Sequence, residues 1–191
     1  AGALEAIETA AENDRSGVIY DRWGVVLMWQ GDLAGAAGKF AQADAFVHRP
    51  YTPSRIVMHI LGQEWGVARE LLMQETRASA PGDTQWIDTL LAAIRDPARR
   101  GPATNRVIDG AIADGRLTVQ YIHGAWLFLG EEQRAIQAAL DLIGQDAPEF
   151  GVEFLLAPQS RALRNNRRFG EILEMLGLNE YWAEHGCPVL F

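Results

Sequence analysis

The chain has 191 residues and a formal net charge of −8, with 48% hydrophobic and 22% charged residues. This length and composition predict a soluble domain or one continuous array with an apolar core. The acidic charge argues against a nucleic-acid surface, because duplex binding relies on clustered Lys and Arg. The longest apolar runs, such as residues 125–129, are far shorter than the roughly 20 residues that cross a bilayer. We therefore expect no contact of this part of the chain with nucleic acid or membrane.

Periodic apolar residues predict helices throughout and essentially no sheet, so the expected fold class is all-α. In chain order the predicted helices are residues 4–12, 18–29, 33–47, 54–61, 66–75, 84–94, 103–113, 117–129 and 131–143. Turn signals separate them, such as Pro81-Gly82, Gly101-Pro102 and Asp114-Gly115. Residues 150–156, 160–164, 168–176 and 180–185 follow as shorter predicted helices.

A repeating unit is clearest from Gly17 to Pro50. Its second helix carries a small-large-small pattern, Ala36, Phe40 and Ala43, after a Gly31-Asp32 turn. Each alanine lets the paired helix approach, and the phenylalanine fills the gap between the two helices. This stretch resembles a tetratricopeptide repeat, a helix-turn-helix unit of about 34 residues. The resemblance implies a right-handed superhelix of stacked helix pairs with a binding surface, and it implies no particular chemistry.

Copies of the pattern recur along the chain. The anchoring alanines are Ala3, Ala36, Ala68, Ala103 and Ala135, and the turns before the later copies are near Gln63, Asp96-Pro97 and Gly130-Glu131. We predict a repeat array over residues 1–149 in which every anchor is buried against its partner helix. Ala3 falls where a second helix belongs, so we expect an array that starts in mid-repeat, as the carboxy-terminal part of a larger protein. The alternative is a solenoid that begins with a lone capping helix.

Residues 150–191 are predicted to form a divergent repeat and a carboxy-terminal cap of the same domain. The arginine-rich turn before Phe169, then Leu176-Gly177-Leu178 and Tyr181-Trp182, resembles the terminal segment of bacterial repeat proteins. In that family the repeats often follow a winged-helix DNA-binding domain or a nucleotide cyclase domain. This sequence departs from the family at Asn166-Arg167, where aspartate-proline is usual. The residues expected to cover the apolar end of the array are Phe169, Leu173, Leu176, Tyr181 and Trp182.

No catalytic or metal-binding constellation emerges from the sequence. The four histidines have no metal-ligand spacing, Cys187 is the only cysteine, and no phosphate-binding glycine loop follows a strand. We therefore predict no enzyme, no metal and no cofactor. The single cysteine makes no internal disulfide, so the fold does not depend on an oxidising compartment. The cytoplasm is therefore expected slightly more than the periplasm as the location of the protein.

The tetratricopeptide resemblance implies that the first helix of each pair lines a concave, partner-binding surface. The residues expected there are Asp21, Arg22, Val25, Met28, Trp29, Gln120, Tyr121 and Phe128. For Trp29 and Phe128 the alternative is packing between adjacent helices. A second group, Arg161, Arg164, Arg167 and Arg168, would bind an anion or an acidic partner, or else pair with the protein's own carboxylates and helix ends.

Together these features predict a non-catalytic interaction or sensing module that binds a protein or peptide, the regulatory part of a larger bacterial protein. One alternative is self-association, in which a homodimer controls an upstream effector domain. A third hypothesis is a helical-repeat enzyme with a small-molecule pocket between Tyr121, Trp126 and the terminal segment.

Overall fold

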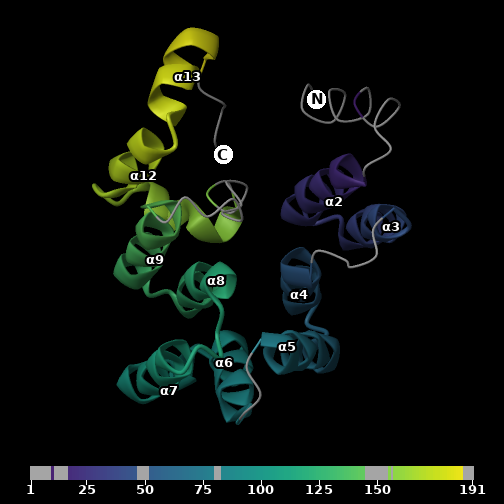
Figure 1. Ribbon diagram of the computed structural model, residues 1–191, viewed down its shortest axis with the longest axis vertical. Helices are drawn as coiled ribbons and strands as arrows, with labels where there is room; N and C mark the ends of the chain where they lie inside the picture. The colour runs from purple at the N-terminus through teal and green to yellow at the C-terminus, as the bar shows by residue number, and fades with distance from the viewer. Residues whose placement is uncertain are drawn as a thin grey trace. The chain divides into compact units, whose positions relative to one another are not determined.

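The computed structural model describes residues 10, 17–46, 52–79, 83–144, 155 and 157–186, except for the side chains of residues 77–79, 119 and 120. Over these residues the fold is all-α, as predicted (Figure 1). The chain divides into two compact units, Ala1–Glu75 and Thr76–Phe191. The predicted boundary between residues 149 and 150 lies within the second unit, in a stretch outside the described residues. That boundary stays a prediction.

The helices follow the predicted order. The first unit holds α2 (Val18–Trp29), α3 (Leu33–Asp44), α4 (Thr52–Leu61) and most of α5 (Trp65–Ser79). The second holds α6 (Gln85–Arg95), α7 (Pro102–Ala113), α8 (Val119–Leu129), α9 (Glu132–Gly144), α11 (Arg161–Arg164), α12 (Phe169–Met175) and α13 (Leu178–His185), with 3-10 turns at Pro97–Arg99 and Pro158–Ser160. Helix α2 begins and ends where predicted. The helices predicted at 4–12 and 150–156 lie outside the described residues, apart from residues 10 and 155.

The four predicted turns between helices are present. Gly31 and Gly130 have φ angles of 86° and 77°, in the left-handed region that glycine enters without steric cost. Gln63 also has a positive φ, 59°, which is uncommon for a residue with a side chain. Asp96 starts the 3-10 helix Pro97–Arg99, and its carboxylate accepts a backbone N–H of that helix at 3.0 Å. The residues of these turns therefore end the first helix of each predicted pair close to the residue that the sequence predicts.

Helices α2 and α3 pack closely along their lengths. Ala36, Phe40 and Ala43 are all buried at their contact. Gly24 of α2 faces the phenylalanine, and a Cβ atom built on it would lie 2.5 Å from the Phe40 Cε1 atom. The absence of a side chain at Gly24 is therefore what lets the aromatic ring fill the space between the helices.

Gly24→Ala should lower the stability of the first unit by about 1 to 3 kcal/mol, because the added methyl group overpacks the Phe40 ring. Gly38→Ala is the matched control. It lies in α3, where an added Cβ atom would meet open space, so alanine there should gain up to about 1 kcal/mol of helix propensity. Urea titrations followed by far-ultraviolet circular dichroism would compare the two. Equal effects of both substitutions would contradict the tight contact.

Arg55 of α4 forms contacts with α2 and α3 in the first unit. Its guanidinium is buried and forms ion pairs with Asp21 of α2 and Asp44 of α3. The same group lies 4.3 Å from the centroid of the Phe40 ring and donates to the Phe40 carbonyl at 3.3 Å. By contrast, α4 and α5 do not pack along their lengths, although the Gln63 turn joins them. The antiparallel pairing predicted for these two helices is therefore limited to the turn.

An aromatic cluster lies on the first helix pair. The rings of Tyr20 and Phe46 stack with centroids 5.7 Å apart. Lys39, the only lysine of the chain, places its Nζ atom 3.4 Å from the centroid of the Trp23 ring. The ammonium also donates to the Gln42 side chain at 3.4 Å. The charge of Lys39 is thus held against the aromatic face by a cation–π contact.

In the second unit the closest helix pair is α8 with α9, and α9 also packs against α12. His123 of α8 is buried and donates from Nδ1 to the Ala135 carbonyl of α9 at 2.7 Å. Helix α6 packs against α7 and α8. Its carboxy-terminal end is capped by Arg100, whose Nε donates to the Ala93 carbonyl at 3.0 Å.

Burial is confirmed for three of the predicted anchors, although at Ala68 the predicted packing of α5 on its partner helix α4 is limited to the turn. Ala36, Ala68 and Ala135 are fully buried. Ala3 lies outside the described residues.

The anchor predicted at Ala103 is wrong. Ala103 is exposed, and Val107, predicted to follow it in the pattern, is 40% exposed. The buried positions of α7 come one residue later, at Thr104, Ile108 and Ala111. Thr104 can take the anchor position because its hydroxyl donates to the Arg99 carbonyl at 2.7 Å, which satisfies the buried polar group.

The predicted cap is partly corrected. Phe169 is buried, as expected, and α12 packs against α9. The other fully buried side chain of α12 is Ile172, whereas Leu173 is only half-buried. Tyr181, expected to be covered, is 57% exposed. Helix α13 contains no buried residue, so the cover on α9 comes from α12 and not from α13.

Ile172→Val should cost about 1 kcal/mol, the usual penalty for removing one buried methylene group. Tyr181→Ala should change the free energy of unfolding by less than about 0.5 kcal/mol, because the side chain is mostly in water. Thermal unfolding of both variants would test this. A larger loss for Tyr181→Ala than for Ile172→Val would show that α13 is the true cap.

Candidate functional site

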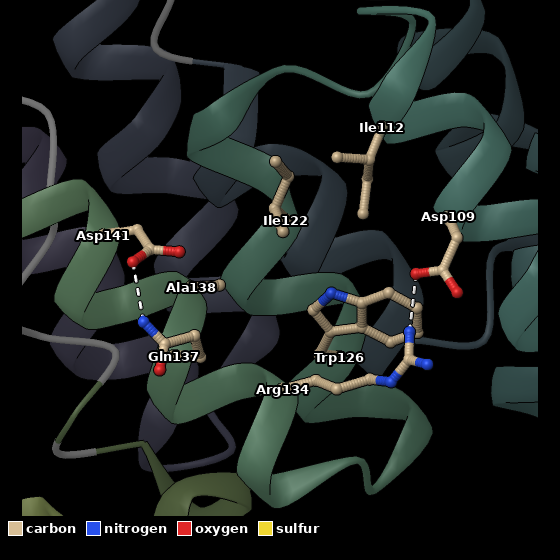
Figure 2. A pocket seen from close by; sticks show the side chains of 8 residues that line it. All are labelled: Asp109, Ile112, Ile122, Trp126, Arg134, Gln137, Ala138 and Asp141. Carbon is tan, nitrogen blue, oxygen red and sulfur yellow. Dashed lines mark hydrogen bonds and ion pairs between the residues drawn. The ribbon is translucent and has the colours of Figure 1, made fainter.

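A pocket lies among three consecutive helices of the second unit, α7, α8 and α9 (Figure 2). Its volume is about 340 Å³, and it is open to solvent. The lining residues are Asp109 and Ile112 of α7, Ile122 and Trp126 of α8, and Arg134, Gln137, Ala138 and Asp141 of α9. Within each helix every one of them has another lining residue three or four positions away, the spacing that places side chains on one face. Each helix therefore contributes one stripe to the pocket.

An ion pair beside an aromatic ring forms one side of the pocket (Figure 2). Trp126 is only 3% exposed, and the guanidinium carbon of Arg134 lies 4.5 Å from the centroid of its ring. Arg134 Nη1 also donates to Asp109 Oδ1 at 2.6 Å, which links α9 to α7. Both charged side chains are nearly half exposed, so the pair contributes at most about 1 kcal/mol. Its main effect is to hold the guanidinium in one place.

Asp141 has a different kind of partner. Its Oδ1 atom accepts a hydrogen bond at 2.7 Å from Nε2 of Gln137, a neutral amide (Figure 2). The Gln137 Oε1 atom accepts in turn from Arg168 Nη1 at 3.1 Å, and Arg168 also pairs with Glu171 of α12. The amide is therefore oriented from both ends, with its N–H toward the carboxylate. The described partner of the Asp141 carboxylate at the pocket is therefore a neutral group.

The predicted partner-binding residues of α2 fall into three environments. Val25 and Met28 are buried in the core, so a partner would not touch them. Asp21 is mostly buried in its ion pair with Arg55. Arg22 is exposed and Trp29 is half-buried. Of the five, only these two present surface to a partner.

The predicted residues of α8 lie in the other unit. Tyr121 and Phe128 are half-buried, and the side chain of Gln120 lies outside the described part of the structure. Neither Tyr121 nor Phe128 lines the pocket. Of the residues in the small-molecule pocket hypothesis, Trp126 lines this pocket and Tyr121 does not. The terminal segment contributes only indirectly, through Arg168 and its bond to Gln137.

The arginine group of the terminal segment is divided by its contacts. Arg164 donates to the carbonyls of Leu155 and Ala157 at 2.9 and 3.1 Å. Burial, and secondarily the nearby charge of Arg161, lowers the pKa of Arg164 below its usual value, although a guanidinium stays protonated in proteins. Arg168 binds Gln137 and Glu171. Two of the four arginines thus have structural contacts, which is the alternative left open by the sequence.

His123 lies in an environment that disfavours its charged form. Burial lowers its pKa below 6.5, and the hydrogen bond to the Ala135 carbonyl opposes this shift without cancelling it. The neutral ring, with its proton on Nδ1, therefore joins α8 to α9, two of the three helices that line the pocket.

The described residues contain no group of three or more His, Cys, Asp or Glu side chains arranged to hold a metal ion. No helix among them has the length and apolarity needed to cross a membrane.

Comparisons with protein-family models, with curated proteins and with solved structures each find no match to this chain. The tetratricopeptide resemblance therefore depends on the residue pattern and on the packing of consecutive helices.

Proposed function

We propose that this chain is a non-catalytic protein-protein interaction module, built from tetratricopeptide-like helix pairs arranged in a right-handed superhelix. It would form the regulatory part of a larger bacterial protein. The proposal is supported above all by the close pairs α2–α3 and α8–α9, each joined by a short turn after a repeat-like first helix. Arrays of this kind use the surfaces of successive helices to bind other proteins.

The pocket supports binding more than chemistry. Its Asp109 carboxylate is paired with Arg134, and its Asp141 carboxylate accepts from Gln137. Both groups are thus engaged with fixed partners on the pocket wall. An aromatic residue, aliphatic side chains and a few oriented polar groups are the usual components of a recognition site.

The test is recovery and reconstitution of a partner. The tagged chain would be purified from its native cells, and each recovered protein would be produced separately and titrated by isothermal calorimetry. The expected result is a saturable complex of defined stoichiometry. The proposal would be contradicted if no recovered protein bound the chain saturably.

Light scattering on the same sample distinguishes the self-association hypothesis. A monomer that binds a different protein fits the proposed function. A stable dimer that binds nothing else would favour a dimerisation module.

A further inference from the structure

We infer that the pocket between α7, α8 and α9 receives a basic side chain, arginine or lysine, from the partner protein. This inference depends on the proposed interaction function and specifies the chemistry that the partner must present.

The charges of the pocket favour a cation. Two carboxylates, Asp109 and Asp141, face a single guanidinium, that of Arg134. The guanidinium is already used twice, by Asp109 at 2.6 Å and by the Trp126 ring at 4.5 Å. An anion would have to displace Asp109 and approach Asp141 as well. The chain's net charge of −8 adds to this repulsion.

Asp141 is the group that a cation would meet. It accepts a hydrogen bond from the neutral amide of Gln137, which satisfies one lone pair of the carboxylate, and among the described residues it forms no ion pair. Asp109, in contrast, is neutralised by Arg134. In Figure 2 the two carboxylates lie on opposite sides of Trp126, so Asp141 is at one end of the pocket.

The remaining walls suit an aliphatic stem. Ile112, Ile122 and Ala138 line the same pocket as Asp141 and Trp126. Arg and Lys bury their methylene groups against such walls while the charged head reaches a carboxylate. The pocket volume, about 340 Å³, is at the lower end of the range for small ligands, about 300 to 1,000 Å³. One long side chain therefore fits it better than a folded peptide segment.

The first experiment titrates the isotope-labelled full chain with a blocked Gly-Arg-Gly peptide and follows assigned amide signals of α9 by NMR. The matched peptide carries citrulline, which keeps the shape of arginine and removes its charge. We expect saturating shifts around Gln137 and Ala138 with arginine, and at least about tenfold weaker binding with citrulline. Equal binding of both peptides, tighter binding of Gly-Glu-Gly, or no shift in the pocket with any peptide would overturn the inference.

Two variants locate the interaction. Asp141→Asn should weaken binding of the arginine peptide about fivefold. Glu132→Gln removes the same charge from an exposed position of α9 that does not line the pocket, and it should leave the affinity unchanged. Equal losses in the two variants would indicate general attraction to an acidic surface and would overturn the inference. Thermal unfolding of each variant checks that the fold is retained.

The reconstituted partner complex separates this inference from the proposed function. Asp141→Asn, but not Glu132→Gln, should weaken partner binding about fivefold, and the arginine peptide should compete with the partner. A partner that binds Asp141→Asn and wild type equally would leave the proposed function intact and overturn the inference. In that case agmatine, a small free amine with the guanidinium group of arginine, is titrated into the chain. If it saturates the pocket, the pocket binds a free small cation and not a side chain of the partner.

Discussion

Arg55→Met should lower the free energy of unfolding of the first unit by about 3 kcal/mol. The substitution removes the guanidinium and leaves Asp21 and Asp44 close together without a counter-charge. Removing one partner of a fully buried ion pair costs about 3 to 5 kcal/mol. The lower end applies here because the Asp44 side chain is 34% exposed and can recruit water. Urea titration followed by circular dichroism would measure the loss.

Two further variants distinguish lost charge compensation from lost packing. The triple variant Arg55→Met, Asp21→Asn, Asp44→Asn removes the two isolated charges and should recover more than half of the stability lost in Arg55→Met. Arg55→Lys should be intermediate, since an ammonium group cannot reproduce two directed contacts and the stacking on Phe40. Wild-type stability of Arg55→Met would show that the three helices do not depend on this network.

Lowering the pH below 6.5 should destabilise the second unit through His123. In the folded protein the pKa of this histidine is lowered by burial, whereas in the unfolded chain it is near 6.5. Between the two values the unfolded state binds the extra proton, so stability rises with pH there. The contribution is complete above pH 6.5 and decreases by about 1.4 kcal/mol per pH unit below it, until the pH reaches the lowered pKa.

The measurement is a series of urea titrations from pH 7.5 to pH 5, a range that largely avoids the titration of ordinary carboxyl groups. His123→Asn keeps a side-chain N–H donor near the Nδ1 position and cannot titrate, so most of the acid-side loss should disappear. His185→Asn, at an exposed histidine of α13, should leave the loss in place. An unchanged pH dependence in His123→Asn would contradict the assignment.

Much of the helical pattern could be predicted because its causes are local. Gly31 and Gly130 end helices through their own backbone freedom, and the spacing of Ala36 and Phe40 marks a buried stripe within one helix. The anchor in α7 is displaced by one residue because a threonine takes it. Thr104 can be buried only through its bond to the Arg99 carbonyl, and a pattern of alanines does not reveal this geometry.

The candidate site was harder to predict because its contacts are distant in sequence. Asp109 and Arg134 are 25 residues apart, and Asp21 and Arg55 are 34 residues apart. In sequence, each of these residues looks like part of a solvated helical face. The stripes Ile122 to Trp126 and Arg134 to Asp141 do have helical spacing, but only the packing of three helices determines that they share one pocket. For Asp21, the distant arginine converts an expected surface residue into an interior contact.

The contact of Lys39 with Trp23 lets tryptophan fluorescence follow the chemical modification of one lysine in the first unit. Because it is the only lysine, acylation of lysine side chains in this chain modifies a single amine, and that amine lies over Trp23. An amide nitrogen carries no positive charge, so the reaction removes the cation from the indole face. The resulting change in tryptophan emission reports acylation directly, and its rate relative to that of a free lysine side chain measures how far the Trp23 contact protects the amine.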